Sequence, residues 1–350
     1  MAFSVIPGRL SYLPLAARRP PGGGAAQPPP TPPDTPSEAY LPMDDFCTYF
    51  PFFIDFGPVC LSRLHRFCTE LSARLRDRAN AARHLHLVSG AHMHRRANCV
   101  YLIAAHGVLC RGLSPEEALR PFAAMSPPLA PWHDASPYVD TFHLTTLDVL
   151  RGVARARDSG FFSMEEFNPE AYEHYEQVAN GDMNWLVEGR FLALAGPVDG
   201  AQDTAEDGEG YHLTTVAELL PVFRELRVTS LVRLNKKYYD ERRFVAAGVA
   251  HLDLYFLDGS NPPPAVLQKF LQFCEATPGE EKGGRGGGGF LELRFSPPLN
   301  HSHTHTHHTH APRSHARARA VCPPPSPQAP SRCTARRAWG ARAPALGRIS

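Results

Sequence analysis

The pattern of apolar and polar positions is clearest in the stretch VTSLVRLNKKYYDERRFVAAGVAHLDLYFLDGSNPPPAVLQKFLQFC, which begins at Val228. Short β-branched runs predict buried strands, and apolar residues at helical spacing predict helices. Gly248 is a common helix stop, and Pro264 opens the next helix. The predicted order is strand Val228–Leu234, helix Asp240–Ala247, strand His251–Leu257 and helix Ala265–Cys274. Such a βαβ unit keeps its chemistry beyond the carboxyl ends of its strands, where Asp258 lies in a turn-forming cluster.

The preceding part of the chain follows the same strand-then-helix plan. Ser114 before Pro115 marks a helix start, Gly160 marks a helix end, and Asn168 before Pro169 marks another start. The predicted helices are Pro58–Leu75, Arg95–Arg111, Thr145–Arg157, Phe167–Val178 and Thr215–Leu226, and the predicted strands include His84–Ser89 and Phe191–Gly196. Alternating strands and helices favour an α/β fold in two units.

Composition changes at both ends of the chain. Of its 350 residues 43% are hydrophobic, but the 35 prolines and 27 glycines gather near the two ends. Segments with little apolar periodicity bury too little surface to offset the entropy of ordering. We therefore expect a disordered Pro-rich leader over residues 1–43 and a disordered Gly/His/Arg/Pro-rich tail over residues 280–350.

Charge and cysteine usage narrow the classes of function. The net charge is +1, so no global field demands nucleic acid or a membrane surface. The tail after Leu293 has no acid, and its flexible His301–His310 tract would bind Zn²⁺ or Ni²⁺ only loosely. Eight cysteines without a CxxC pair, and the lack of any long apolar run, predict a soluble protein in a reducing, intracellular compartment.

Three stretches carry a resemblance to a known family: YEHYEQVANGDMNW, VRLNKKYYDERRF and LDGSNPP. They resemble the cell-division-cycle-14 family of dual-specificity protein phosphatases, and the likeness extends over roughly Asp45 to Pro278. The resemblance implies two tandem dual-specificity-phosphatase-like domains joined by a helix, with the second domain incomplete. It divides the chain into a non-catalytic N-terminal domain at 44–166, a linker helix at 167–179 and a partial C-terminal phosphatase domain at 180–279.

The same resemblance indicates what is missing. Family members continue with a central strand and a His-Cys-x-x-Gly-x-x-Arg loop that carries the nucleophile, whereas this chain continues with EEKGGRGGGG. Cys60 with Arg66 and Cys68 with Arg74 match the bare spacing, but on a predicted helix without the glycines that a phosphate loop needs. Phe290–Phe295 alternates charged and apolar residues, so it suits a half-exposed strand rather than a buried central one. We therefore expect a second domain of marginal stability that exposes apolar sheet surface.

The resemblance implies roles for four acids. Asp258 corresponds to the general acid that protonates the leaving oxygen, and an ordinary turn residue is its alternative interpretation. Glu173, Glu176 and Asp182 correspond to acids lining an interdomain groove that binds a basic residue following the phosphosite. For these three acids the alternative is a solvated acidic face. The family mechanism implies no metal and no cofactor.

The family implies removal of phosphate from Ser/Thr-Pro and Tyr sites of proteins in late mitosis and cytokinesis, in the nucleus, centrosome or spindle. Because the nucleophilic cysteine and the phosphate-binding arginine are absent, this chain is predicted to be a catalytically inactive, truncated isoform or fragment. Three interpretations remain open: an active phosphatase, a poorly folded product, and a non-catalytic module that binds phosphoproteins with proline and a basic residue after the phosphosite. No specific nucleic acid or membrane partner is expected.

Overall fold

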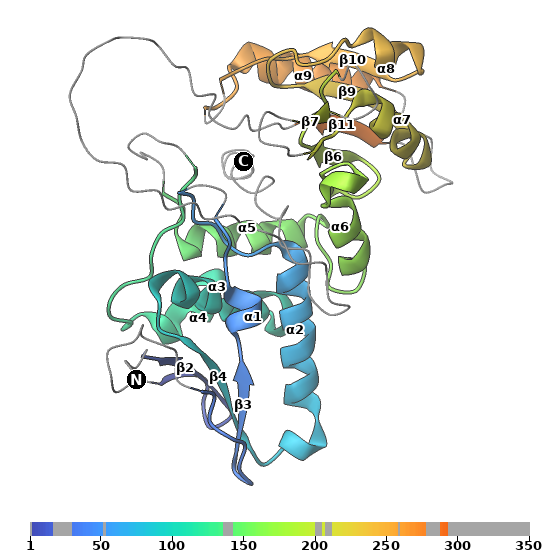
Figure 1. Ribbon diagram of the computed structural model, residues 1–350. Helices are drawn as coiled ribbons and strands as arrows, with labels where there is room; N and C mark the ends of the chain where they lie inside the picture. The colour runs from blue at the N-terminus through green and yellow to red at the C-terminus, as the bar shows by residue number, and fades with distance from the viewer. Residues whose placement is uncertain are drawn as a thin grey trace, which may run out of the picture.

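The computed structural model describes residues 2–16, 30–51, 54–135, 143–199, 205–206, 212–257, 260–277 and 288–292. The chain forms a four-stranded sheet near the N-terminus and a five-stranded sheet in the second half. Helices accompany each sheet (Figure 1). A small pair, β7 (Ala205–Glu206) and β8 (His212–Leu213), is antiparallel. Each large sheet has its own cluster of buried apolar side chains. The predicted α/β class is confirmed.

The first sheet takes most of its strands from the Pro-rich start of the chain. It comprises β1 (Phe3–Ile6), β2 (Leu10–Leu15), β3 (Glu38–Pro42) and β4 (His84–Gly90), in the order β1-β2-β4-β3. β1 is antiparallel to β2, and β4 is parallel to both β2 and β3. Phe3, Leu10 and Tyr12 are buried in the core. The prediction that residues 1–43 form a disordered leader is therefore wrong for these strands.

The positions of the prolines explain why the composition was misleading. Pro14 lies in β2 beyond Tyr12, where the register with β1 ends, and Pro42 is the last residue of the edge strand β3. Proline is tolerated at strand ends and edges because it removes a ladder hydrogen bond only where one is dispensable. These strands have four to six residues. Such short strands are easily hidden by Pro-rich surroundings.

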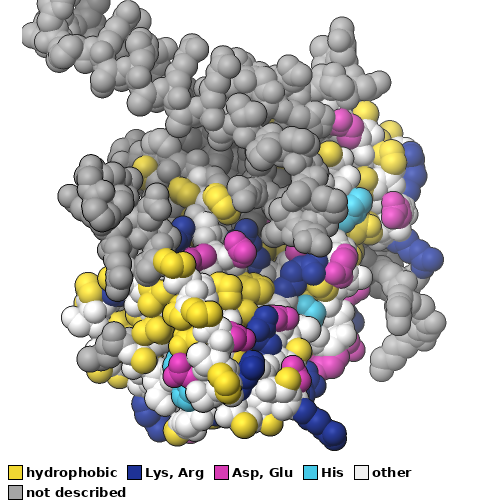
Figure 2. All heavy atoms as spheres, turned by 60° about the horizontal axis from the view of Figure 1, so that its bottom comes forward, with side chains coloured by type: hydrophobic (Ala, Val, Ile, Leu, Met, Phe, Trp, Pro, Cys, Tyr) yellow, Lys and Arg dark blue, Asp and Glu magenta, His cyan; other side chains and the backbone are white. Residues whose placement is uncertain are grey.

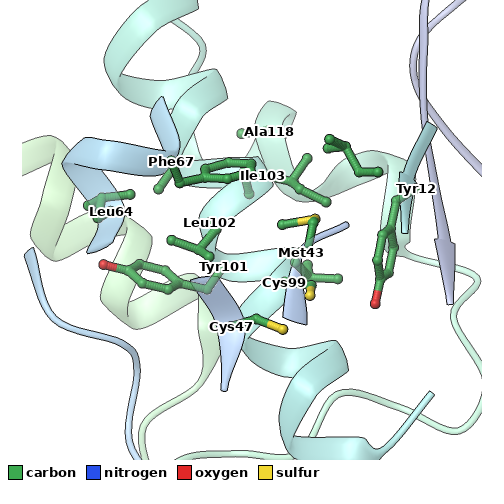
Figure 3. Close-up of a cluster of buried hydrophobic side chains, with 14 of the residues drawn as sticks. Tyr12, Met43, Cys47, Leu64, Phe67, Cys99, Tyr101, Leu102, Ile103 and Ala118 are labelled. Carbon is green, nitrogen blue, oxygen red and sulfur yellow. The ribbon is translucent and has the colours of Figure 1, made fainter. Parts of the chain in front are cut away.

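The helices of the first unit surround α3. They are α1 (Asp44–Cys47), α2 (Leu61–Arg76), α3 (Met93–Arg111), α4 (Pro115–Leu119) and α5 (Thr146–Asp158), with short 3₁₀ turns η1 (Arg78–Asn80) and η2 (Arg120–Phe122). Every α3 residue from Arg96 to Val108 is buried. Figure 3 shows Tyr101, Leu102 and Ile103 of α3 among side chains from other elements. The predicted helices are confirmed, with bounds that differ by at most three residues.

The segment between the two units begins with α6 (Pro169–Tyr175) and continues with the 3₁₀ turn η3 (Val178–Asn180). The Asn168 side chain accepts a hydrogen bond from the backbone N–H of Ala171 at 2.9 Å, as predicted for a helix cap. The helix stops at Tyr175, three residues before the predicted end at Val178. In Figure 1, α6 lies between the helices of the first unit and the second sheet.

The second unit has the strand order β10-β9-β11-β6-β5. Its strands are β5 (Met183–Val187), β6 (Phe191–Leu194), β9 (Val228–Arg233), β10 (Ala250–Asp253) and β11 (Gly288–Glu292), and its helices are α7 (Val216–Glu225), α8 (Arg242–Ala246) and α9 (Pro264–Ala276). All neighbouring pairs are parallel except β5 with β6. Gly248 has φ +87° after α8, as a helix stop requires.

The central strand β11 overturns one prediction. Gly288–Glu292 pairs in parallel with β9 on one side and β6 on the other, although the pattern there favoured a half-exposed strand. Without β11, the facing edges of β9 and β6 would leave backbone N–H and C=O groups unpaired inside the sheet. A short neighbouring segment can satisfy both edges through its backbone, whatever its side-chain pattern. The expected disordered tail from residue 280 therefore includes a strand.

Large apolar side chains are exposed in both units among the described residues: Ile54, Met93 and Phe161 in the first, and Val245, Tyr255, Leu257, Leu267 and Leu271 in the second. Figure 2, which turns the bottom of Figure 1 forward, shows apolar side chains on the surface there. In the second unit they lie on α8, on α9 and after β10 rather than on a strand, so the expected exposure of apolar sheet surface stays a prediction. The helix α9 has no buried residue, and Leu267 and Leu271 on it are 46% and 50% exposed. The contrast is with α2, whose Leu64, Phe67 and Leu71 are fully buried. In the part of the chain that the structure describes, no helix has the length and apolar character to cross a membrane.

Candidate functional site

A cavity of about 340 Å³ lies at the carboxyl ends of β9 and β10, the strand edge at which the βαβ pattern predicted the site. Its lining side chains come from the ends of the two strands and the segments that follow them: Arg233, Asn235, Lys236, Lys237, Asp253 and Tyr255. Parallel strands bring their carboxyl ends to one edge, so residues twenty positions apart meet there. The site is defined by three cationic side chains and one carboxylate.

Arg233 is buried, with 1% of its side chain exposed. Its Nε and Nη2 atoms donate to the two carboxylate oxygens of Asp253 at 2.7 and 2.8 Å, and Nη1 donates to the Tyr239 carbonyl at 2.8 Å. The guanidinium also lies over the Tyr239 ring, 4.5 Å from its centre. A buried charge is tolerated when it is paired in this way. Arg233 is therefore a fixed part of the cavity wall.

The two lysines are exposed and differ in their pairing. Lys237 Nζ contacts Glu241 Oε2 at 2.7 Å, and this hydrogen bond is the main reason why the pKa of Glu241 is lowered to about 2. Lys236 forms no ion pair with any residue that the structure describes, and its backbone N–H donates to Asn235 Oδ1 at 2.6 Å. Ammonium groups of this kind bind phosphate oxygens through charge-assisted hydrogen bonds. The cavity is chemically suited to a small anion.

Sequence reasoning missed Asn235, Lys236 and Lys237 as site residues. They were part of the stretch that carried the family resemblance, but no role was assigned to them. The available signal was their position directly after a predicted buried strand, at the edge where α/β sheets bind ligands.

The predicted general acid Asp258 lies outside the described residues. Its described neighbours are Leu257, after β10, and Ser260, before α9. The backbone N–H of Ser260 donates to the Leu257 carbonyl at 3.1 Å. The role of Asp258 stays a prediction.

Glu173 is paired within the chain. Its two carboxylate oxygens accept hydrogen bonds from Nε and Nη2 of Arg66 on α2, both at 3.0 Å, and the Ser62 hydroxyl donates to it as well. Arg66 also contacts Glu170 at 3.1 Å. These bonds, chiefly those that Arg66 donates to Glu173, raise the pKa of Arg66. The carboxylate of Glu173 thus joins α6 to α2 rather than facing solvent.

Glu176 and Asp182 are buried as well, 3% and 9% exposed. Burial raises the pKa of the nearby Cys60 thiol to about 11, and the charge of Glu176 adds to this rise. Asp182 has φ +51°, a left-handed conformation that aspartate adopts more readily than most residues. The alternative of a solvated acidic face is wrong for both residues. Their role in binding a basic residue stays a prediction.

The two cysteines that match the bare Cys-to-Arg spacing of a phosphate loop, Cys60 and Cys68, are part of the packed interior. Cys60 and Cys68 are buried on or beside α2, and the pKa of each is raised, Cys60 chiefly by burial and Cys68 chiefly by its hydrogen bond to Cys110. A nucleophilic thiolate requires the opposite shift. The basic stretch at the start of α3 is structural too, because Arg96 is buried and donates to the carbonyls of Pro127 and Pro128. No group of three metal-binding side chains occurs among the described residues, and the His301–His310 tract lies outside them.

Comparison with known proteins agrees with this architecture. Residues 4–156 match the family model described as the N-terminal half of dual specificity protein phosphatases. That match begins in β1 and therefore includes strands from the Pro-rich start of the chain. The match therefore places this part of the chain in the class of dual specificity phosphatases.

Individual relatives narrow the class to one family. Dual specificity protein phosphatase CDC14A of Mus musculus is 39% identical over 249 residues, covering 71% of this chain and 41% of the relative. CDC14B of Mus musculus is 34% identical over 248 residues, covering 71% and 50%. Tyrosine-protein phosphatase CDC14 of Saccharomyces cerevisiae is 32% identical over 251 residues, covering 70% and 44%. The chain belongs to the CDC14 family and spans about half or less of the length of these relatives.

Proposed function

We propose that this chain binds phosphorylated protein segments at the cavity beyond β9 and β10 without hydrolysing them. The observation that carries the proposal is in the sequence: no cysteine follows a histidine, and no cysteine begins a Cys-x-x-Gly-x-x-Arg loop. A cysteine phosphatase needs that thiolate to attack phosphorus and that arginine to hold the phosphoryl oxygens. Loss of the nucleophile in another covalent enzyme costs a factor of about 10⁶ in rate.

The side chains of the cavity support the proposal that the chain still binds phosphate groups. Lys236 and Lys237 supply ammonium groups at the strand edge, and Asn235 adds an amide donor beside them. A phosphate group that enters the cavity would gain charge-assisted hydrogen bonds from these side chains. Asp258 follows β10 at the same edge in sequence, so it remains the general acid of a reaction that this chain no longer completes.

For the residue after the phosphosite, the proposal assigns Glu173, Glu176 and Asp182 to recognition of a basic side chain. Support comes from Glu173, which already accepts two hydrogen bonds from a guanidinium, that of Arg66. A substrate arginine or lysine would share or displace this cation, while Glu176 and Asp182 add negative charge at the junction. The proposed partners are phosphoproteins with proline and a basic residue after the phosphosite, acting in mitosis and cytokinesis at the nucleus, centrosome or spindle.

The proposed domain division follows from the same family membership. A non-catalytic first domain reaches to residue 166 and includes the strands β1–β3, a linker covers 167–179, and a partial catalytic domain runs from residue 180 to 279. The segment β11 adds a strand to this second domain.

The first test is hydrolysis of para-nitrophenyl phosphate by the full chain, with Asp258→Ala as the comparison. We expect no turnover above the buffer rate in either protein. Turnover that Asp258→Ala abolishes would mean that a cysteine of this chain acts as the nucleophile, and the proposal would be wrong. A cooperative melt of the same sample separates an inactive folded protein from a poorly folded one.

The second test is binding of a fluorescent phosphoserine-proline peptide with a basic residue, measured by anisotropy. Lys236→Ala combined with Lys237→Ala should weaken binding by about tenfold or more, because a hydrogen bond to a charged group contributes about 1.5–3 kcal/mol. Lys269→Ala, an exposed lysine on α9, is the matched control and should bind like the parent. Equal affinity for the unphosphorylated peptide would contradict a phosphate site.

A further inference from the structure

The facing sides of α2 and α3 bring a cluster of reactive side chains together. Cys68, Ser72 and Arg76 follow one another at four-residue spacing on α2, and His106 and Cys110 do so on α3. Ser72 Oγ and His106 Nε2 are hydrogen-bonded at 3.1 Å, which sets the two stripes against each other. The side chains of Cys68 and Ser72 lie beside the sulfur of Cys110, near enough to alter its pKa.

The two cysteines in this cluster have different environments. Cys110 is exposed near the end of α3, whereas Cys68 is fully buried. Hydrogen bonds from Cys68 and Ser72, with the charge of Arg76, lower the pKa of Cys110 to about 7 in spite of partial burial and the charge of Glu165. The same hydrogen bond and burial raise the pKa of Cys68. The accessible sulfur therefore ionises more readily than the buried one.

We propose that Cys68 and Cys110 form a peroxide-sensitive thiol pair, in which Cys110 is oxidised first and Cys68 then closes a disulfide between α2 and α3. The Cys110 thiolate attacks one oxygen of hydrogen peroxide, the O–O bond breaks, and hydroxide leaves as Cys110 becomes a sulfenic acid. The sulfur of Cys68 attacks the sulfur of that sulfenic acid, the S–O bond breaks, and the proton of Cys68 leaves with the hydroxide as water. Two thiols lose two electrons, and one peroxide becomes two waters.

The geometry favours this order of events. Oxidants and thiol reagents reach Cys110 from solvent. The sulfenic acid that forms at Cys110 lies beside Cys68, so the second step needs no domain movement. Closing the bond brings the two sulfurs to about 2.05 Å. Cys110 is the second-last residue of α3, ahead of Gly112 with φ +68°, so the end of the helix can accommodate the shift. The pair is unrelated to the phosphate cavity in the second unit.

Peptide mapping of the full chain after treatment with hydrogen peroxide tests the proposal. We expect a linked peptide containing Cys68 and Cys110, with the loss of two hydrogens. With Cys68→Ala, dimedone should trap a sulfenic acid at Cys110, and with Cys110→Ser, Cys68 should stay reduced. Cys274→Ser, a half-buried cysteine whose pKa is raised by burial, is the control and should leave the linked peptide unchanged. All of these proteins carry Cys322→Ser and Cys333→Ser, so that these two cysteines, which lie outside the described residues, cannot form other disulfides.

Alkylation of the unmutated chain gives an independent check in case Cys68→Ala fails to fold. The rate of iodoacetamide labelling at Cys110 should titrate with a midpoint near the pKa of about 7 in the native protein and near 8.5 in urea. At pH 7 the native site should react about threefold faster, since its larger thiolate fraction is partly offset by lower nucleophilicity. A native midpoint at the urea value, or peroxide oxidation of Cys110 that never links to Cys68, would overturn the proposal.

Discussion

The Arg66 guanidinium on α2 is bound by both carboxylate oxygens of Glu173 on α6, at 3.0 Å from Nε and from Nη2. The two residues are 107 positions apart, and their contact connects α2 of the first unit to α6. The pair is partly shielded, with 40% and 20% of the two side chains exposed. Consequently, the acid that we propose for substrate recognition also has a structural partner.

Removing this partner should have two effects in opposite directions. Arg66→Ala should lower the free energy of unfolding by about 1 kcal/mol, at the upper end for partly exposed ion pairs. It should also strengthen binding of the basic phosphopeptide several-fold, because Glu173 is released. Urea denaturation and anisotropy measure the two effects.

The matched control is Arg74→Ala, which removes an exposed pair with Glu70 within α2. It should cost no more than about 0.5 kcal/mol and leave peptide binding unchanged. If Arg66→Ala weakens peptide binding, Glu173 is not the acid that holds the basic residue.

The buried Arg233 predicts a larger effect on stability. Arg233→Ala should destabilise the second unit by about 3 kcal/mol, because it leaves Asp253 and the Tyr239 carbonyl without their donor and removes the contact with the Tyr239 ring. Arg233→Lys should recover only part of this, since an ammonium cannot form the bidentate pair. Hydrogen exchange of β9 and β10 measures the loss locally.

Arg243→Ala is the comparison for Arg233. Arg243 pairs with Asp199 at 3.2 Å, with about 40% of each side chain exposed. Its removal should cost less than about 1 kcal/mol. Equal losses for the two variants would contradict the importance of burial at Arg233.

His106 predicts how stability depends on pH. Burial, with a smaller contribution from Arg111, lowers its pKa to about 4 in the folded chain, against about 6.5 when unfolded. Between these values the unfolded chain binds more protons, so the free energy of unfolding falls as pH drops from about 7 to 4. The fall from this group is on the order of 3 kcal/mol.

Replacing His106 by glutamine should remove that part of the pH dependence. Urea denaturation at pH 7 and pH 5 should differ less for His106→Gln than for the parent. His92→Gln, at an exposed histidine, should keep the parental difference. An unchanged difference in His106→Gln would show that this histidine titrates alike in both states.

The central position of β11 predicts the effect of a proline there. Leu291 pairs with Ala193 of β6 and Val232 of β9, so Leu291→Pro removes an N–H from the middle of the sheet. We expect loss of hydrogen-exchange protection in β6 and β9, while α3 in the first unit stays protected. Leu291→Val, which keeps the N–H, should behave like the parent. Unaltered protection in the proline variant would mean that the second unit folds without β11.

Local patterns were sufficient for the helices and for most strands of the middle region. The caps at Ser114, Asn168 and Thr215 are present because each side chain needs only its own neighbours to accept a backbone hydrogen bond. The strands β1–β3 were missed because short strands in Pro-rich sequence acquire their stability from pairing: β2 and β3 pair with β4, which is distant in the chain, and β1 pairs with β2. The pattern also predicted the strand edge that holds the cavity, but not its lysines.

The sequence by itself determined the α/β class, the order of the middle elements, the family and the lack of a His-Cys loop, because all of these depend on residues close together in the chain. Tertiary structure alone decided the use of Gly288–Glu292 as the central strand, the capture of Glu173 by Arg66 and the meeting of Cys68 with Cys110. Each of these is a contact between segments that are distant in the chain. Which strand edge, charged group or thiol a residue meets is decided only when folding brings those segments together.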